Sequence, residues 1–135
     1  MTPAIALYLP VEVLARELDG KLLLALIARE RGWRPVIGYK RAIRDRGALL
    51  PPGVLLSHNA RLGKPRMFAR MAGYGHRTVV LDEEALVRQT DEIFLLKHDP
   101  QAFAKVELVL SWGEDDAALW TGSSLVDSGK VRVTG

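Results

Sequence analysis

Three consecutive acidic residues, Asp82, Glu83 and Glu84, directly follow a short run of apolar, β-branched residues. Clustered carboxylates repel one another, which raises the pKa of at least one of them and can supply a general base or a nucleophile. The same residues also suit the start of a helix, where Asp caps free N–H groups and Glu favours the positive end of the helix dipole. Helix capping is the simpler interpretation of the triplet, and a catalytic role is the more specific one.

Polar residues follow the other apolar runs of the chain as well. In open parallel α/β sheets, ligands bind outside the carboxyl ends of the strands, so these positions are the first candidates for a site. They are Glu12, Tyr39, Lys40, Ser57, His58, Trp112 and Glu114. His58 lies in a loop-like segment between polar neighbours and could move a proton or bind phosphate. The spacing of the three histidines predicts no metal site.

Charged residues also gather where the first helix is expected to start, at Glu12, Arg16, Glu17, Asp19 and Lys21. Pairs four residues apart, Glu12 with Arg16 and Glu17 with Lys21, would each stabilise a helix by about 0.2–0.5 kcal/mol. Arg16 and Lys21 beside a helix N-terminus would also suit an anion. The spacing leaves both interpretations open.

Several function classes are excluded or disfavoured by what the sequence lacks. It contains no Walker sequence, no G-x-G-x-x-G motif and no G-x-S-x-G elbow, and the turn after the first apolar run reads Leu9-Pro10-Val11-Glu12.

Basic residues far outnumber acidic ones between Arg29 and Arg77. That stretch predicts a solvated basic face, or one that meets phosphate, an acidic sugar or an anionic membrane. Nucleic acid is not expected, because this stretch has few stacking aromatics and no recognition motif.

Apolar runs that alternate with helical stretches predict the elements that position these residues. Strands are expected at 5–9, 35–39, 53–57, 77–81, 107–111 and 131–134, and helices at 11–31, 40–47, 62–74, 83–87, 91–104 and 115–121. Asp19-Gly20 could delay the first helix to that point. The alternation predicts an α/β fold, a three-layer Rossmann-like domain with a mostly parallel sheet of about six strands.

Three local signals refine this prediction. Pro10 is expected to end the first strand, because proline cannot donate to a central ladder. Gly32 is expected to end the first helix in a left-handed conformation. Met67, Phe68 and Met71 have helical spacing and are expected in the core.

The length of 135 residues, 48% of them hydrophobic and 26% charged, predicts a single domain over residues 1–135. There is no cysteine, so no disulfide, thiolate zinc site or cysteine nucleophile is expected. The start lacks a signal-peptide pattern, and no apolar stretch is long enough to span a bilayer, which predicts a cytoplasmic location. The sequence stops directly after a predicted strand, so a truncation before a further domain is expected.

Several segments resemble the N-terminal part of the bacterial surface carbohydrate biosynthesis proteins. They are Leu7-Tyr8-Leu9-Pro10-Val11-Glu12-Val13, Arg16-Glu17-Leu18-Asp19, Lys21-Leu22-Leu23-Leu24-Ala25-Leu26 and Glu30-Arg31-Gly32. Leu81-Asp82-Glu83-Glu84 and Ser111-Trp112-Gly113-Glu114 are similar to two later motifs of the family, and Val131-Arg132-Val133-Thr134-Gly135 resembles a strand that the family follows with Asn-Pro-Arg. The chain departs from the family at Ala85-Leu86-Val87-Arg88, where glycine and small residues are expected.

That family is of the GT-B glycosyltransferase-like type, akin to Kdo transferases and to glycerophosphotransferases that use CDP-glycerol. The resemblance implies the N-terminal, acceptor-side half of a nucleotide-sugar-dependent transferase for capsule or lipopolysaccharide, inactive as an isolated domain. No cofactor is expected in this domain, and a missing C-terminal domain would hold the nucleotide-activated sugar or CDP-glycerol donor. The implied partners are a glycan or lipid-linked glycan acceptor, that C-terminal domain and the inner face of the cytoplasmic membrane.

The resemblance also implies roles for individual residues. A carboxylate among Asp82, Glu83 and Glu84 would deprotonate an acceptor hydroxyl or attack an anomeric carbon. The substrate side would be formed by Glu12, Arg16, Glu17, Asp19, Lys21, His58, Trp112 and Glu114.

Two alternatives to a transferase remain. One is a self-standing flavodoxin-like module that binds a phosphate ligand or has a regulatory role. A response regulator needs an acidic pair after the first strand and an Asp after the third, where this chain has Glu12 alone and Ser57-His58. The other is a small phosphate-ligand enzyme that uses His58 and Glu114.

Overall fold

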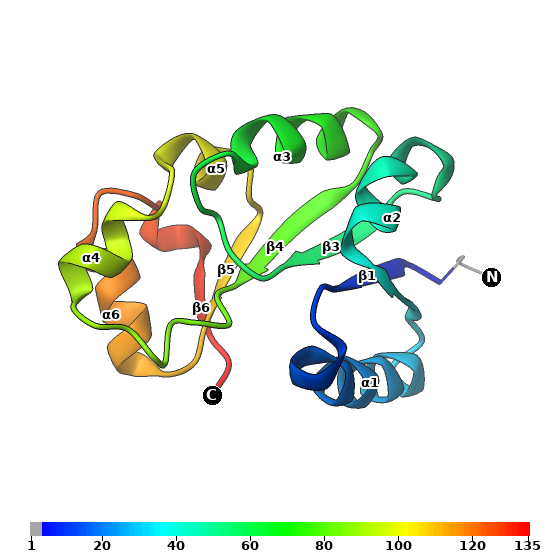
Figure 1. Cartoon of the computed structure of the whole chain (residues 1–135), viewed down its shortest axis with the longest axis horizontal. Coiled ribbons are helices and arrows are strands. Elements are labelled where there is room, and N and C mark those ends of the chain that lie inside the picture. The colour runs from blue at the N-terminus through cyan, green and yellow to red at the C-terminus, as the bar shows by residue number, and fades with distance from the viewer. Residues whose placement is uncertain (1–3) are drawn as a thin grey trace. The chain divides into compact units, whose positions relative to one another are not determined.

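The computed structural model of the chain describes residues 4–135, in which strands and helices alternate (Figure 1). The strands are β1 (Ala6–Val11), β2 (Arg34–Tyr39), β3 (Gly53–Ser57), β4 (Arg77–Leu81), β5 (Leu108–Ser111) and β6 (Val131–Val133). The α-helices are α1 (Leu14–Glu30), α2 (Lys40–Asp45), α3 (Lys64–Gly73), α4 (Asp91–Leu96), α5 (Pro100–Ala104) and α6 (Glu114–Gly122). Two short 3₁₀ helices are η1 (Gly47–Leu49) and η2 (Ser128–Lys130). None of the helices in residues 4–135 has the length and apolarity needed to cross a membrane.

The six strands form one sheet in the order β2-β1-β3-β4-β5-β6. The pairs β1–β2, β1–β3, β4–β5 and β5–β6 are parallel. The predicted α/β class is therefore confirmed as a parallel six-stranded sheet flanked by helices, consistent with a Rossmann-like three-layer fold.

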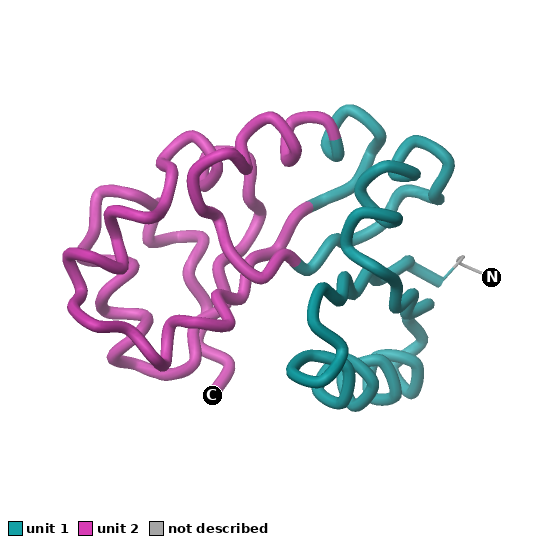
Figure 2. Tube along the Cα trace, in the orientation of Figure 1, with its two compact units in different colours: residues 1–56, 71–77 teal, residues 57–70, 78–135 magenta. Residues whose placement is uncertain are grey.

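The chain divides into two compact units (Figure 2). Unit 1 consists of Met1–Leu56 and Met71–Arg77, and unit 2 of Ser57–Arg70 and Thr78–Gly135. The expectation of a single domain over the whole chain stays a prediction.

Tyr8 lies at the centre of unit 1. Its side chain is fully buried, and its hydroxyl donates a hydrogen bond of 2.6 Å to the carbonyl oxygen of Pro51. The ring of His76 meets it edge-on, with centroids 5.3 Å apart. Helices α1 and α2 lie on opposite sides of β1 and β2 (Figure 1). A polar aromatic side chain with a satisfied hydroxyl thus anchors the core of this unit.

The core of unit 2 is built on four rings. Trp120 and Phe103 are buried together with Phe94 and His98, and the centroid of Trp120 lies 5.3 Å from Phe94 and 5.4 Å from Phe103. Apolar residues from β4, β5, α5 and α6 complete this cluster. Helix α6, which carries Trp120, packs on β5 and β6. The core of unit 2 therefore lies directly beneath the residues that follow β4 and β5.

Helix α1 is continuous through Asp19-Gly20, so a start at Gly20 is wrong. The reason lies at its N-terminus, where the Glu17 carboxylate accepts hydrogen bonds from the backbone N–H groups of Glu12 and Val13, at 2.9 and 3.3 Å. These bonds satisfy groups that a helix otherwise leaves free. Burial raises the pKa of Glu17, but these N–H groups and Arg16 outweigh it and hold the pKa below its ordinary value.

The end of α1 confirms the role predicted for Gly32. Its φ of 83° is left-handed. Its N–H donates to the carbonyl of Arg29, and the N–H of Trp33 donates to that of Ala28. This is the pattern of a Schellman motif, which glycine favours because it has no Cβ.

Several predicted boundaries shift by one to three residues, and Val11, expected to start the first helix, belongs to β1 instead. Strand β1 includes Pro10 and ends at Val11. Pro10 is tolerated because β3 pairs only with Ala6 to Tyr8, so at Pro10 the strand is paired with β2 alone. Strand β5 begins at Leu108, one residue later than expected.

The helical segments expected between β4 and β5 also differ. Residues 83–87 form turns, because Asp82 and Arg88 bond the backbone there in place of a helical ladder. The helix expected at 91–104 is split into α4 and α5. The split occurs because the Asp99 carboxylate caps a new helix by accepting from the N–H of Gln101, with Pro100 in its first turn.

Candidate functional site

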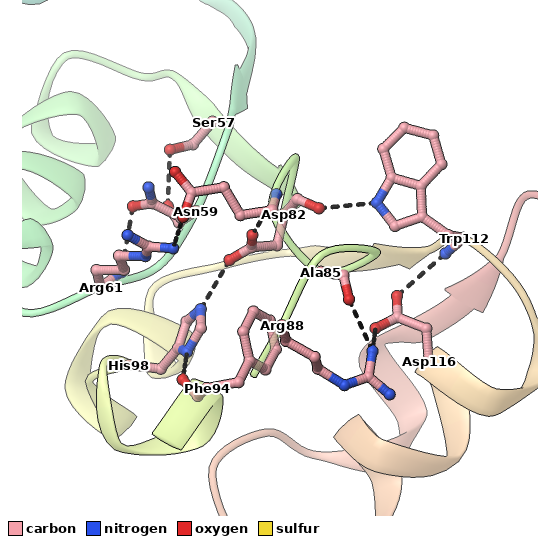
Figure 3. Close-up of polar contacts among 11 residues, drawn as sticks. Ser57, Asn59, Arg61, Asp82, Ala85, Arg88, Phe94, His98, Trp112 and Asp116 are labelled. Atoms are coloured by element: carbon pink, nitrogen blue, oxygen red, sulfur yellow. Dashed lines mark hydrogen bonds and ion pairs between the residues drawn. The ribbon is translucent and has the colours of Figure 1, made fainter. Parts of the chain in front are cut away.

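The strongest candidate site lies in unit 2, where β4 and β5 end side by side. Asp82 follows β4 and Trp112 follows β5, and the two strands pair up to Leu81 and Leu110. The indole N–H of Trp112 donates a 2.7 Å hydrogen bond to the backbone carbonyl of Asp82 (Figure 3). Two of the positions predicted from sequence are thus brought into contact by the sheet.

The carboxyl group of Asp82 is enclosed. Its residue is 1% exposed, and Oδ1 accepts the backbone N–H of Glu84 at 2.9 Å. Oδ2 lies 2.8 Å from Nε2 of His98, which α4 and α5 hold between them and which is also buried (Figure 3). Both oxygens are therefore engaged inside the protein and hold the turn, and a catalytic role for Asp82 stays a prediction.

Both ring nitrogens of His98 have a polar partner. Nδ1 lies 2.8 Å from the carbonyl oxygen of Phe94, and Nε2 faces Oδ2 of Asp82. Rings of Phe94, Phe103 and Trp120 surround the imidazole, with centroids 4.7, 5.9 and 5.1 Å away. The pair is a buried polar link within an aromatic core.

The other two acids of the triplet face different surroundings. Glu84 is exposed and forms an ion pair with Arg61. Glu83 is half-buried, and its N–H donates to the carbonyl of His58 at 3.3 Å. The carboxylates of Asp82 and Glu84 therefore have different partners, His98 and Arg61. Glu83 and Glu84 are the members that solvent reaches.

A pocket of about 580 Å³ opens beside this turn. Its walls combine one aromatic ring, one guanidinium and several carboxylates, and are formed by Leu86, Arg88, Gln89, Thr90, Asp91, Trp112, Gly113, Glu114, Asp115 and Asp116. Trp112 and Glu114 were both predicted as site residues from their place after a strand. The pocket lies at the carboxyl end of β5 and the start of α6, where an α/β sheet is expected to bind a ligand.

Asp116 is the buried charge of this pocket. It is 4% exposed, and Oδ2 accepts the backbone N–H of Trp112 at 3.1 Å. Within residues 4–135, Oδ1 has no hydrogen-bond donor of normal geometry, and it lies 4.0 Å from a guanidinium nitrogen of Arg88. That guanidinium also donates to the carbonyl of Ala85 at 2.7 Å. Burial raises the pKa of Asp116, and the lowering by Trp112, Arg88 and the indole of Trp120 does not cancel it.

Asp116→Asn is expected to raise the stability relative to the parent more at neutral pH than at acidic pH. The raised pKa means that the native state binds the proton more tightly than the unfolded state does. This stabilising term is complete below the ordinary Asp pKa of 3.8 and is lost as pH rises through the raised value. Asp116→Asn keeps an oxygen for the N–H of Trp112 but cannot ionise.

Urea unfolding of the parent and Asp116→Asn at about pH 3.5 and pH 7 measures this difference. The stability of the variant relative to the parent should increase between the two pH values. Asp115→Asn, at an exposed neighbouring position of α6, is the control for removing a charge at the helix start. An equal pH effect in both variants would contradict the assignment.

The charged residues predicted near the first helix lie in unit 1. Lys40 Nζ bonds the carboxylate of Glu12 at 2.8 Å, and Arg16 pairs with Glu17 at 3.0 Å. Lys21 is buried, whereas Asp19 is exposed. The structure thus brings a strand-end acid and a strand-end base together in this unit. A substrate role for these residues stays a prediction.

Three residues of the unit 2 site were missed in the sequence. His98, Arg88 and Asp116 lie on or near helices, where the strand-end rule does not look. A buried side of α6 could have singled out Asp116, but nothing local connects His98 with Asp82. In residues 4–135, no group of three His, Cys, Asp or Glu side chains is arranged to hold a metal ion.

Comparisons with known proteins found no match to this chain among protein-family models, curated proteins or solved structures. The resemblance to surface carbohydrate biosynthesis proteins is therefore a prediction from the sequence motifs alone.

Proposed function

We propose that this chain is the acceptor-side domain of a GT-B-like glycosyl- or glycerophosphotransferase of bacterial surface polysaccharide assembly. The observation that carries the proposal is the pocket after β5, whose lining combines Trp112 and Arg88 with the acids Glu114 and Asp115. The Rossmann-like fold and the family-like motifs on both sides of the pocket add support.

The composition of the pocket suits a sugar. A sugar ring has a face of C–H groups that packs on an aromatic ring and a rim of hydroxyls that donate to carboxylates. Four acids, Asp91, Glu114, Asp115 and Asp116, line the pocket against one base, Arg88. This excess of negative charge disfavours a phosphate ligand, so the alternative of a phosphate-binding module receives no support from this pocket.

In the proposed reaction, a carboxylate of the turn after β4 accepts the proton of an acceptor hydroxyl. The oxygen then attacks the anomeric carbon, or the phosphorus of a glycerophosphoryl donor, and the nucleotide leaves with the electron pair of the broken bond. Glu83 and Glu84 suit the base because they are accessible, and Asp82 holds the turn through His98. The donor would belong to a C-terminal domain, and acceptors presented at the inner face of the cytoplasmic membrane are part of the same proposal.

We expect the chain to bind capsule or lipopolysaccharide-core oligosaccharides through this pocket, measured by NMR titration of a ¹⁵N-labelled sample. Trp112→Ala and Glu114→Gln should each weaken binding about tenfold, which corresponds to ~1.4 kcal/mol. Trp33→Ala is the matched control, because Trp33 is also half-buried but lies in unit 1.

Two outcomes of this titration would contradict the proposal. If the oligosaccharides bind no better to the parent than to Trp112→Ala and Glu114→Gln, the pocket is not an acceptor site. Shifts produced by inorganic phosphate in the pocket residues, with none from sugars, would favour the phosphate-binding alternative.

A further inference from the structure

Helix α1 carries most of its large aliphatic residues on its outer face. Lys21 and Ala28 are buried on the inner side, where Glu17, Leu18 and Ala25 are half-buried. Leu23 and Leu26 are 61% and 65% exposed, and Leu22, Leu24 and Ile27 are exposed as well. A helix of a folded protein ordinarily shows the opposite arrangement.

The inward side of α1 explains this inversion. Glu17, whose carboxylate caps the helix, and Lys21 both have buried side chains and lie on the side that faces unit 1. With 3.6 residues per turn, Leu23, Leu26 and Ile27 point away from that side, whereas Ala25 lies half-buried on it. The aliphatic run from Leu22 to Ile27 then forms a contiguous apolar surface, and surfaces of this kind mark interaction sites.

The charges within this outer face decide what covers it. Asp19 and Glu30 are both exposed, before and after the aliphatic run. A helix that lies in a membrane keeps carboxylates off its apolar face, because burying them among acyl chains is costly. A protein surface accommodates Glu30 where a cation faces it, and Asp19 lies within one helical turn of Arg16 of its own chain. The outer face of α1 therefore fits a protein partner better than a lipid surface.

The spacing along α1 identifies a second copy of this chain as that partner. Arg16, Leu23 and Glu30 are seven residues apart and so lie along one stripe of the helix. If two copies of α1 cross antiparallel about a two-fold axis at Leu23, Arg16 of each faces Glu30 of the other. Gly20 then faces Leu26 of the second copy, and a Cβ added at Gly20 would meet no atom of its own chain within 4 Å. We propose that the protein forms a two-fold dimer through this α1 face.

Such an interface is isologous, so each contact occurs twice. Opposite charges at matching positions set the antiparallel register, as they do in paired helices generally. The aliphatic run supplies the apolar centre of the interface and the two Arg–Glu pairs its ends. This inference concerns unit 1 alone and does not depend on the proposed transferase function.

Sedimentation equilibrium of the purified chain tests the dimer. The parent should show twice the mass of the 14.9 kDa chain at micromolar concentration. Leu23→Glu should raise the dimer dissociation constant at least about 100-fold. Arg16→Glu and Glu30→Arg should each weaken the dimer, and the double variant should regain affinity. Leu49→Glu is the matched control, because Leu49 is 84% exposed in the same unit.

A second measurement locates the axis even if a charge variant folds poorly. The chain has no cysteine, so Leu23→Cys introduces a single thiol. A short bismaleimide should link two copies of this variant but not two copies of Leu49→Cys. A monomer at every concentration, or a dimer that Leu23→Glu leaves intact, would overturn the proposal. Sedimentation of the monomer with anionic vesicles, lost in Leu23→Glu, would assign the face to a membrane and overturn it equally.

Discussion

Replacing His98 by alanine is expected to lower the free energy of unfolding by about 3–5 kcal/mol. The reason is that Asp82, which is 1% exposed, would keep its carboxyl in the protein interior without its partner at 2.8 Å. Breaking one side of a buried pair leaves an uncompensated charge, whose desolvation is not repaid. The alanine also removes a ring that contacts Phe94 and Trp120.

Urea unfolding of His98→Ala, Asp82→Ala and the double variant measures this effect and separates its parts. The double variant should lose less than the two single losses together, because neither polar group is then left alone. Glu84→Ala is the control from the same turn, since the exposed Arg61–Glu84 pair is expected to contribute less than about 1 kcal/mol. A loss in His98→Ala no larger than in Glu84→Ala would show that the buried pair does not hold the turn.

The strands that position the site could be predicted from local sequence. β3 and β4 occupy the residues expected for them, 53–57 and 77–81, because each is a short β-branched run between glycine, proline or charged residues. The end of α1 was equally local, since Gly32 alone supplies the left-handed turn. The place of Trp112 and Glu114 beside the pocket followed from the strand-end rule.

The parts that the sequence could not predict depend on distant partners. Asp82 and His98 are 16 residues apart, and the sheet and α4 must both form before they meet. As a result, the Asp82 carboxyl stabilises a turn where a helix cap was expected. The split between α4 and α5 did have a local signal, because Asp99-Pro100 is a favourable cap and first position for a new helix.

Helix α1 shows a different reason for failure. Its sequence contains a block of six apolar residues from Leu22 to Ile27, which covers all sides of a helix and so predicts no buried face, and the structure leaves its large residues exposed. The side of the helix that is buried carries Glu17, whose carboxylate accepts two backbone N–H groups, together with Lys21 and Ala28. Polar side chains that must be satisfied inside unit 1 thus outweigh an apolar pattern whose burial another surface can complete.

Trp120→Ala is expected to destabilise the protein by about 3–5 kcal/mol, the usual cost of removing a buried indole. Trp120 is fully buried in the core of unit 2, against Phe94 and Phe103. Alanine would leave a cavity under the strand ends that carry the candidate site. Against a typical total stability of about 5–15 kcal/mol, such a loss is a large fraction.

The measurement is urea unfolding followed by circular dichroism, with Leu96→Ala as the control at a position that is 78% exposed. That control should change stability by less than about 0.5 kcal/mol. A cost for Trp120→Ala as small as this would mean that the aromatic cluster does not support unit 2.

Trp120→Phe distinguishes packing from hydrogen bonding at the same position. The indole N–H of Trp120 makes no hydrogen bond of normal geometry within residues 4–135, although it lowers the pKa of Asp116, so phenylalanine removes only a weak polar contact while it keeps a ring beside Phe94 and Phe103. Trp120→Phe should therefore cost markedly less than Trp120→Ala. The ring centroids of Trp120 and His98 are 5.1 Å apart, so the losses of stability in the alanine variants at these two positions should not be additive. Their double variant should lose less stability than the two single variants together, which would link the aromatic core to the turn that carries Glu83 and Glu84.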